Sequence, residues 1–310
     1  MITIYKNNVT GLETIEQPTS GCWLNAVDPT PSEITFLQET LSVPQDFVTY
    51  PLDQGEMPRT EKENGSMLIV LRVPSFQGES ADVPYITVPL GIVMNHKMVA
   101  TICKTETNTI RAMIAGRARA LSTGKRNRFI LHLLLLAANR FLSDLREINK
   151  ITDSLEDRLQ HALRNKELLG LLKYQKSLVY FTTALKANQL LLRHLQKNQL
   201  FQQYPDDQDL LDDVLTEVDQ AIEMTNIASS ILSQMMGAFA AIISNNLNSV
   251  MKFLASLTIV VSLPTMLASF FGMNVGLPLQ DSPYAFPLIL LVASGVCVVL
   301  VVVLWRKDWL

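Results

Sequence analysis

The stretch VMKFLASLTIVVSLPTMLASFFGMN, residues 250–274, decides the fold of this chain. It carries one charge, Lys252, and is long enough to cross the hydrocarbon core of a bilayer as a helix. The helical pattern around it begins soon after Pro205 and meets no other proline before Pro264. A helix of roughly 65 residues is much longer than a bilayer is thick. We therefore expect a stalk helix over residues 206–271 that passes directly into a transmembrane helix.

A second uncharged run, AFPLILLVASGVCVVLVVVL at residues 285–304, predicts a second transmembrane helix. The chain as a whole has a hydrophobic fraction of 48% and a mean hydropathy of +0.20, which is high for a soluble protein, and the excess lies in these two C-terminal runs. The loop between them, residues 272–284, has no Lys or Arg, whereas Lys252 lies at the start of the first span and a basic tail, residues 305–310, follows the second. By the positive-inside rule we expect a plasma-membrane protein with both termini in the cytoplasm.

Residues 1–125 show the pattern of a mixed α/β domain, and residues 126–205 that of a helical region. A helix should begin near Pro31 with Thr30 as its N-cap, and the polar segment 53–64 should form a loop or short turns. Strand-like runs rich in Ile, Val, Leu and Thr occur at residues 2–5, 22–27, 67–74, 85–94 and 98–103, and helical periodicity occurs at 129–164 and 166–197.

Charge and composition exclude several classes of protein. The net charge of −3, without a basic patch interleaved with aromatic residues, argues against nucleic-acid binding. The three cysteines are far apart, which argues against a disulfide framework. The four histidines are scattered and no nucleophile–base pair accompanies them, so we do not expect an enzyme. The start, MITIYKNNV, lacks the apolar run of a signal peptide.

The expected stalk carries a seam of residues that step by four and three, which is the 3.5-residue repeat of a coiled coil. We expect this seam to gather several copies of the chain. Its members are Leu211, Leu215, Val218, Ile222, Thr225, Ser229, Leu232, Met236, Phe239, Ile243, Asn246 and Val250.

Small and polar residues, which we call the polar stripe, follow one face of the first span with the same spacing. Two interpretations remain open: close helix–helix packing in lipid, or the lining of a pore that several copies would have to enclose. The members of the polar stripe are Asn248, Met251, Ala255, Thr258, Ser262, Thr265 and Ser269.

An acidic cluster marks the start of the stalk helix. Asp206 or Asp207 could cap this helix, and Asp209, Asp212 and Asp213 fill its first turns. The cluster fits a solvated helix start that complements the helix dipole, and it also fits a peripheral divalent-cation site, because carboxylates at i and i+3 or i+4 share a face.

The triplet Gly272-Met273-Asn274 follows directly after the first of the two spans. In this place it resembles the signature of the CorA family of divalent-cation channels. The resemblance extends over essentially the whole chain. It includes Trp23-Leu24-Asn25, Asp28-Pro29-Thr30, Pro58-Arg59-x-Glu61, Asn245-Asn246-Leu247-Asn248-x-x-Met251-Lys252, Pro264-Thr265 and Arg306-Lys307-Asp308-Trp309-Leu310.

The resemblance implies a funnel-shaped homopentamer, with an α+β cytoplasmic domain, a long stalk helix and two transmembrane helices. It implies passive, potential-driven transport of Mg²⁺, with Co²⁺ and Ni²⁺ as further candidates, across a lipid bilayer and without an organic cofactor. Gly272, Met273 and Asn274 would form the selective mouth of the pore. Asn248 would form a second polar ring, and Met251 and Leu254 an apolar gate, while Thr258, Ser262, Thr265 and Ser269 would line the rest.

The sequence departs from the family pattern at several positions. Ser262 replaces an apolar gate residue, and Leu279 replaces a carboxylate of the outer loop, for which Asp281 could substitute. Gly237 and Tyr50 stand where relatives carry the aspartates of an intracellular Mg²⁺ sensor. Other carboxylates could take the place of these aspartates in a regulatory metal site. They are Asp53, Glu56, Asp209, Asp212 and Asp213. A zinc transporter of the same family and a non-conducting membrane-anchored sensor are the alternative functions.

Overall fold

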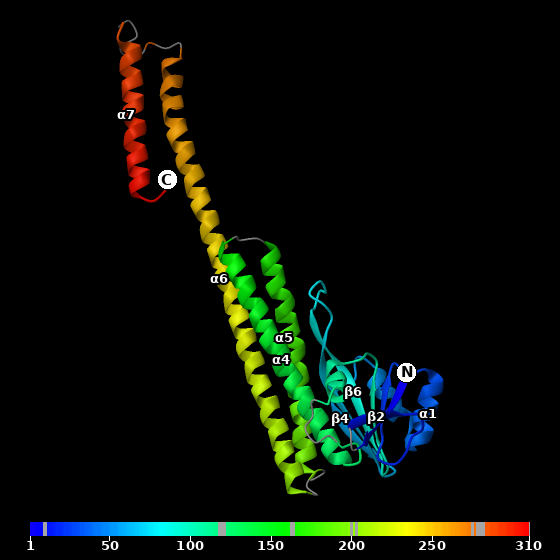
Figure 1. Ribbon diagram of the computed structural model, residues 1–310. Coiled ribbons are helices and arrows are strands. Elements are labelled where there is room, and N and C mark those ends of the chain that lie inside the picture. The colour runs from blue at the N-terminus through cyan, green and yellow to red at the C-terminus, as the bar shows by residue number, and fades with distance from the viewer. Residues whose placement is uncertain are drawn as a thin grey trace. The chain divides into compact units, whose positions relative to one another are not determined.

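The computed structural model describes residues 1–8, 11–116, 122–161, 165–198, 201, 204–273, 276 and 283–309. These form two compact units, Met1–Met235 and Met236–Leu310. Helix α6 (Pro205–Phe271, yellow to orange in Figure 1) contributes to both units. The fold class is the expected one: an α+β domain, a long helix and a second apolar helix, α7 (Ala285–Arg306).

A seven-stranded mixed sheet organises the first unit. Its strand order is β2-β1-β3-β7-β6-β5-β4, and the pair β3–β7 is parallel whereas the other pairs are antiparallel. The strands are β1 (Ile2–Asn8), β2 (Gly11–Ile15), β3 (Trp23–Val27), β4 (Arg59–Glu63), β5 (Ser66–Phe76), β6 (Tyr85–Met94) and β7 (Val99–Cys103).

The two strands that the sequence pattern did not predict are the two edges of this sheet. The segment 53–64 was expected to be a loop, but Arg59–Glu63 forms β4, which pairs only with β5. Likewise β2 pairs only with β1. Edge strands are half solvated and carry charged side chains, so they lack the alternating apolar pattern on which the prediction depended.

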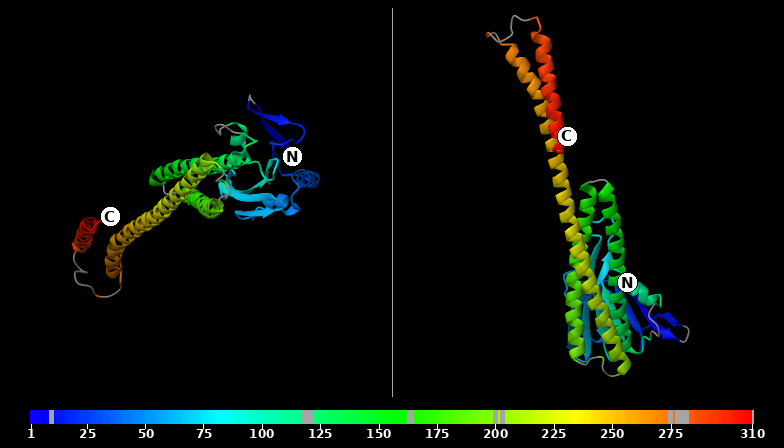
Figure 2. Two further views of the ribbon diagram at one scale, coloured as in Figure 1. Left: turned by 90° about the horizontal axis from the view of Figure 1, so that it is seen from below. Right: turned by 90° about the vertical axis from the view of Figure 1, so that its left-hand side faces the viewer.

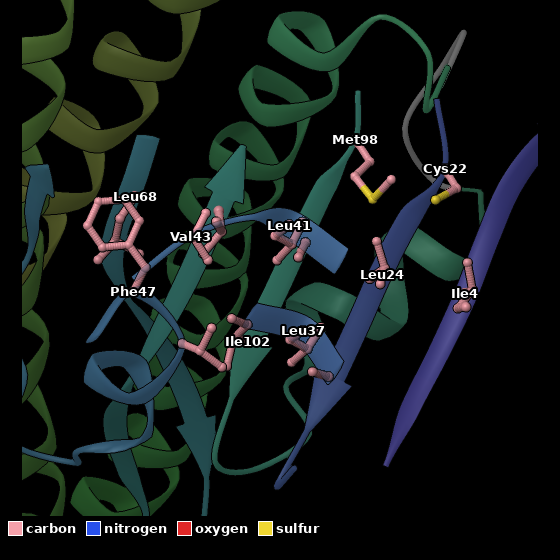
Figure 3. Close-up of a cluster of buried hydrophobic side chains, with 14 of the residues drawn as sticks. Ile4, Cys22, Leu24, Leu37, Leu41, Val43, Phe47, Leu68, Met98 and Ile102 are labelled. Carbon is pink, nitrogen blue, oxygen red and sulfur yellow. The ribbon is translucent and has the colours of Figure 1, made fainter. Parts of the chain in front are cut away.

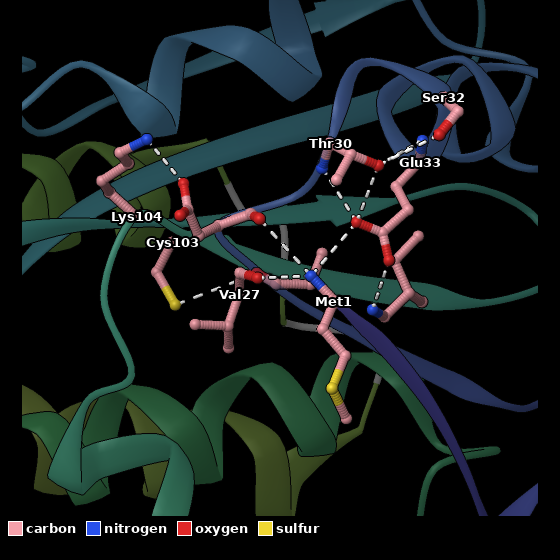
Figure 4. A network of polar contacts seen from close by, with 10 residues as sticks. Met1, Val27, Thr30, Ser32, Glu33, Cys103 and Lys104 are labelled. Carbon is pink, nitrogen blue, oxygen red and sulfur yellow. Dashed lines mark hydrogen bonds and ion pairs between the residues drawn. The ribbon is translucent and has the colours of Figure 1, made fainter.

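One face of the sheet is covered by α1 (Pro31–Leu41), α2 (Gln45–Thr49) and the 3₁₀ turn η1 (Tyr50–Leu52). Figure 3 shows the apolar cluster between them, in which Leu37, Leu41 and Phe47 pack over the sheet. The predicted cap of α1 is confirmed, because the Glu33 N–H donates to Thr30 Oγ1 and the Thr30 N–H donates to Glu33 Oε2 at 2.8 Å (Figure 4).

The opposite face is covered by longer helices, α4 (Arg126–His161) and α5 (Asn165–Lys197), with the short α3 (Asn108–Ile114) beside α4. Aromatic rings fill this layer, and the Trp23 and Phe129 centroids are 5.1 Å apart. Asn188 of α5 inserts its amide against β5: the Arg72 N–H donates to Asn188 Oδ1 at 3.0 Å, and Asn188 Nδ2 donates to the Arg72 carbonyl at 2.7 Å. A buried amide thus ties helix to sheet through both polar groups of one residue.

The first part of α6 packs beside α4 and α5, as both views in Figure 2 show. Its buried residues step by four and three: Leu211, Val214, Val218, Ala221, Thr225, Ala228, Leu232, Met235 and Phe239. The predicted seam shares Leu211, Val218, Thr225, Leu232 and Phe239 with this set. The alternate members of the predicted seam as far as Met236, such as Ile222, are half-buried, and the fully buried residue lies one position earlier, as Ala221 does. The shared residues are buried in their own chain and are not available to gather copies, whereas the role of the half-buried members between copies stays a prediction.

The start of α6 differs from the expectation that Asp206 or Asp207 would cap it. The helix begins at Pro205, so both aspartates lie in the first turn. Arg128 Nε donates to Asp207 Oδ1 at 2.8 Å and its Nη2 donates to Asp206 Oδ2 at 3.2 Å. The carboxylates thus complement the helix dipole, as expected, and also fix α6 to the start of α4.

The buried Asp144 of α4 makes the stability of this unit depend on pH. Burial raises the pKa of its carboxyl to about 6, although the Arg140 guanidinium beside it lowers the pKa. The folded pKa lies above that of the unfolded chain, so the stabilisation is complete below about pH 4 and is lost as the pH rises through about 6. Part of this loss already occurs between pH 4 and 5, so we expect Asp144→Asn to raise stability by about 1 kcal/mol more at pH 7.5 than at pH 5.

Thermal unfolding of the full chain in detergent at the two pH values measures this effect. The exposed Asp153→Asn on the same helix is the control. A difference between Asp144→Asn and the wild type that is the same at both pH values would contradict the assignment.

Candidate ion-conduction site

The second unit contains the end of α6 and the antiparallel helix α7, which lie side by side (Figure 2). Both α6 and α7 are long and apolar enough to cross a membrane. Their large apolar side chains are exposed in the single chain, for example Leu291 at 71% and Val298 at 63%. Such exposure of aliphatic side chains would be costly in water and is natural in lipid.

Helix α7 covers one side of α6 and leaves the polar stripe uncovered. The residues of α6 that are buried or half-buried here are Lys252, Ser256, Val260, Leu263, Pro264 and Leu267. The members of the polar stripe from Asn248 to Ser269 are all exposed. At 100° per residue, the stripe is centred about 140° around α6 from the side that faces α7. Contact with α7 therefore does not account for the stripe.

Two hydroxyl groups of the stripe point their protons into their own helix. Thr258 Oγ1 donates to the Leu254 carbonyl at 2.8 Å, and Thr265 Oγ1 donates to the Val261 carbonyl at 2.9 Å. Each oxygen keeps lone pairs that can accept a hydrogen bond. A hydrated cation presents the hydrogens of its water shell outward, so a surface of acceptors suits it.

The expected gate residues also lie on the uncovered part of α6. Met251 is 59% exposed and Leu254 is 50% exposed, and Asn248 is exposed one turn earlier. Ser262 is exposed further along the stripe.

The expected selectivity triplet begins at the end of α6. The helix ends at Phe271, the Gly272 N–H donates to the Ala268 carbonyl at 3.0 Å, and Met273 is 53% exposed. A Cβ on Gly272 would be 3.6 Å from its nearest neighbours, an ordinary contact, so the single chain gives no steric reason for a glycine there. Asn274 lies outside the described residues, as do Leu279 and Asp281.

The carboxylates considered for a regulatory metal are engaged separately. Glu56 is paired with Arg59 at 2.9 Å, and Asp53 Oδ1 accepts from the Gly55 N–H. Asp212 accepts from Gln196 Nε2 at 2.8 Å. Asp209 and Asp213 are exposed on α6. Among the described residues, no group of three or more His, Cys, Asp or Glu side chains could hold a metal ion.

Tyr50 and Gly237, where the family resemblance leads us to expect sensor aspartates, carry no carboxylate. The Tyr50 ring lies under the Arg59 guanidinium, 4.4 Å from ring centroid to Cζ, and its hydroxyl donates to Asp46. Gly237 is exposed, with no atom within 4 Å of an added Cβ.

Two side chains of the second unit that the sequence analysis did not single out make contacts between α6 and the region of α7. They are Ser256 and Cys297. Neither belongs to the polar stripe, and only the nearby Pro264 could have drawn attention to them.

Together these features define a class of membrane protein in which a long helix continues from an α/β domain into the first of two spans. The model of the CorA-like Mg²⁺ transporter family matches residues 19–307. The chain therefore belongs to the CorA family of metal-ion transporters.

Known relatives agree with this assignment. The cobalt/magnesium transport protein CorA of Methanocaldococcus jannaschii is 24% identical over 298 residues, which is 93% of this chain and 91% of that protein. The complete structure of the CorA magnesium transporter from the same organism matches 100% of this chain and 99% of its own with a TM-score of 0.87 and 21% identity.

A more distant match is the ZntB cytoplasmic domain from Vibrio parahaemolyticus. It covers 79% of this chain and 97% of its own, with a TM-score of 0.59 and 13% identity. At such identities a structural match shows likeness of fold alone.

The two interpretations of the polar stripe predict different reactivity of introduced cysteines. In a Cys297→Ser background, we expect Thr258→Cys to react with a water-soluble methanethiosulfonate about tenfold faster than Val260→Cys. Thr258 would face a water-filled pore, whereas Val260 is half-buried on the side of α7. The native Cys22 and Cys103 are fully buried, so we do not expect them to react with the reagent. Equally slow reaction at both positions would favour helix packing.

Proposed function

We propose that this protein conducts Mg²⁺ passively into the cell through a pore formed by five copies of the chain, driven by the membrane potential. The observation that carries the proposal is the polar stripe of α6, which is exposed on the side away from α7 and leads to Gly272-Met273-Asn274. One stripe cannot enclose a pore, and several stripes around an axis can. Co²⁺ and Ni²⁺ are further candidate ions.

The chemistry of the stripe suits an ion that keeps its water shell. Mg²⁺ releases its waters reluctantly, so neutral hydroxyl and amide oxygens can bind these waters without stripping them. The described members of the stripe include no charged residue, so no fixed charge would trap the ion. Met251 and Leu254 would form an apolar constriction that closes by losing water.

Exposed apolar side chains of the first unit support self-association of the chain. Ile227 and Ile231 of α6 are about half exposed, and Val179 and Leu190 of α5 are exposed at 59% and 68%. These residues lie on the helix sides that their own chain does not cover. Exposed aliphatic side chains of this kind are common at protein–protein interfaces.

The charge distribution supports an orientation with both termini in the cytoplasm. Lys252 lies at one end of the first span, and Arg306 and Lys307 end the second span on the same side of the membrane. The α/β unit would then face the cytoplasm, and the triplet would face the outside.

A regulatory Mg²⁺ site on this chain would use carboxylates of more than one copy. Within one chain Glu56 and Asp212 already have partners, whereas Asp209 and Asp213 are exposed on α6. We propose the acidic start of α6, with Asp53, as the surface on which such a site would form.

The role of Asn274 can be tested by growth. We expect Asn274→Ala to abolish Mg²⁺-dependent rescue of a strain that lacks Mg²⁺ uptake, because the amide oxygens that would bind the hydrated ion are lost. Asn139→Ala, at an exposed position of α4, is the matched control. Full rescue by Asn274→Ala at the same expression level as the wild type would contradict the proposed role of Asn274.

Flux into liposomes separates the candidate ions. An inside-negative potential of about 100 mV favours entry of a divalent ion by about 4.6 kcal/mol, so Mg²⁺ uptake should rise steeply with potential. We expect Co²⁺ and Ni²⁺ to compete with Mg²⁺, and Zn²⁺ to compete weakly. Preferred uptake of Zn²⁺ would instead indicate a zinc transporter, and absence of any flux would indicate a non-conducting sensor. Varying the internal Mg²⁺ in the same assay tests regulation.

A further inference from the structure

Pro264 leaves one backbone carbonyl of α6 without its helical partner. Proline has no N–H, so the Val260 carbonyl, four residues earlier, cannot receive the usual hydrogen bond. In lipid no water replaces the missing donor, and an unpaired carbonyl is costly. Cys297 of α7 fills this gap: its thiol donates to the Val260 carbonyl, with 3.7 Å between Sγ and the oxygen.

A second contact lies one helical turn away on the same side of α6. Ser256 is fully buried, and its single hydroxyl proton is shared between two carbonyls, that of Lys252 at 2.8 Å and that of Trp309 at 3.3 Å. Ser256 is thus tied to the segment that follows α7, and Figure 1 shows this segment turning towards α6.

The turn after α7 is built to present the Trp309 carbonyl. Asp308 has a left-handed φ of 52°, the Trp309 N–H donates to the Leu304 carbonyl at 3.0 Å, and the Asp308 N–H donates to the Trp305 carbonyl at 3.1 Å. This pair of bonds is the Schellman motif, which fixes the path of the chain after a helix. A left-handed aspartate has a cost in free energy, so the turn is a specified feature.

Both contacts hold α6 on the side opposite to the polar stripe. A rotation of α6 by one residue position would break them and would bring Leu257 and Val261 to the places of Thr258 and Ser262. We propose that Ser256 and Cys297 are positioning residues for ion conduction: they fix the rotation of α6 so that the polar stripe, and not its aliphatic neighbours, faces the pore. The proposal rests on the conduction proposed above.

Substitutions that remove or keep each donor test the proposal in the full-length protein in liposomes. We expect Cys297→Ala and Ser256→Ala each to lower Mg²⁺ influx about fivefold, the scale of one lost buried hydrogen bond. Cys297→Ser and Ser256→Thr keep a donor and should stay within about twofold of the wild type. Influx through the alanine variants equal to that of the wild type would overturn the proposal.

Thiol accessibility separates positioning from a loss of stability. In the Cys297→Ser background, a water-soluble methanethiosulfonate should modify Thr258→Cys faster than Leu257→Cys. Adding Ser256→Ala should lower the ratio of the two rates by at least about threefold, because the helix can rotate. A fall in influx with an unchanged ratio would mean that Ser256 acts through stability alone, and the proposal would then be wrong.

A truncation pair removes the acceptor instead of the donor, in case Ser256→Ala does not fold. Deleting residues 309–310 removes the Trp309 carbonyl and should reproduce the loss of influx and the change of ratio. Deleting Leu310 alone turns the Trp309 carbonyl into a carboxylate, whose oxygen can still accept the bond from Ser256, and should change neither. Equal behaviour of the two deletions would contradict the proposal. If the wild type carries no Mg²⁺, the proposed function fails, while the ratio of modification rates still decides whether Ser256 positions α6.

Discussion

The second unit depends on one constraint: a chain in lipid must satisfy its backbone polar groups from within. Helices α6 and α7 meet it by forming continuous hydrogen-bonded helices, and the hydroxyl groups of Thr258 and Thr265 donate to carbonyls of their own helix. Pro264 has no N–H, which leaves the Val260 carbonyl without its helical partner, and the Cys297 thiol of α7 donates a hydrogen bond to this carbonyl instead. The proline therefore makes α6 depend on α7, because the compensation must come from another element.

Different sides of helix α6 contact different parts of the protein along its length. In the first unit, residues spaced by four and three, such as Leu211 and Val218, pack on their own chain. In the second unit, Ser256 and Val260 face α7. A third side carries the polar stripe, which has no partner within the described chain. The face left without a partner is the one that a pore would use.

The first unit uses buried polar contacts to fix its helices to the sheet. Arg72 donates from its guanidinium to the carbonyls of Gln54 and Glu56, while its backbone pairs with Asn188 of α5. At the other end of the helical layer, Arg128 of α4 holds the start of α6 through Asp207. All of these bonds except the exposed one to Gln54 are partly buried, so breaking them has a cost in free energy and they restrict how the helices can move against the sheet.

The sequence by itself determined the two spans, the long helix, the capping box at Thr30 and the polar stripe, because each is a local or periodic pattern along one element. It predicted the central strands for the same reason and missed β2 and β4, whose outer edges are solvated. The role of the Gly272-Met273-Asn274 triplet and of the gate residues remains a prediction. Only the tertiary structure decided that Ala221 and Ala228 are buried and Ile222 is half-buried, because the side of α6 that is covered depends on where the other helices of the chain lie. It alone brought Cys297 to the carbonyl that Pro264 leaves unpaired, since that contact joins residues far apart in the sequence and follows no period.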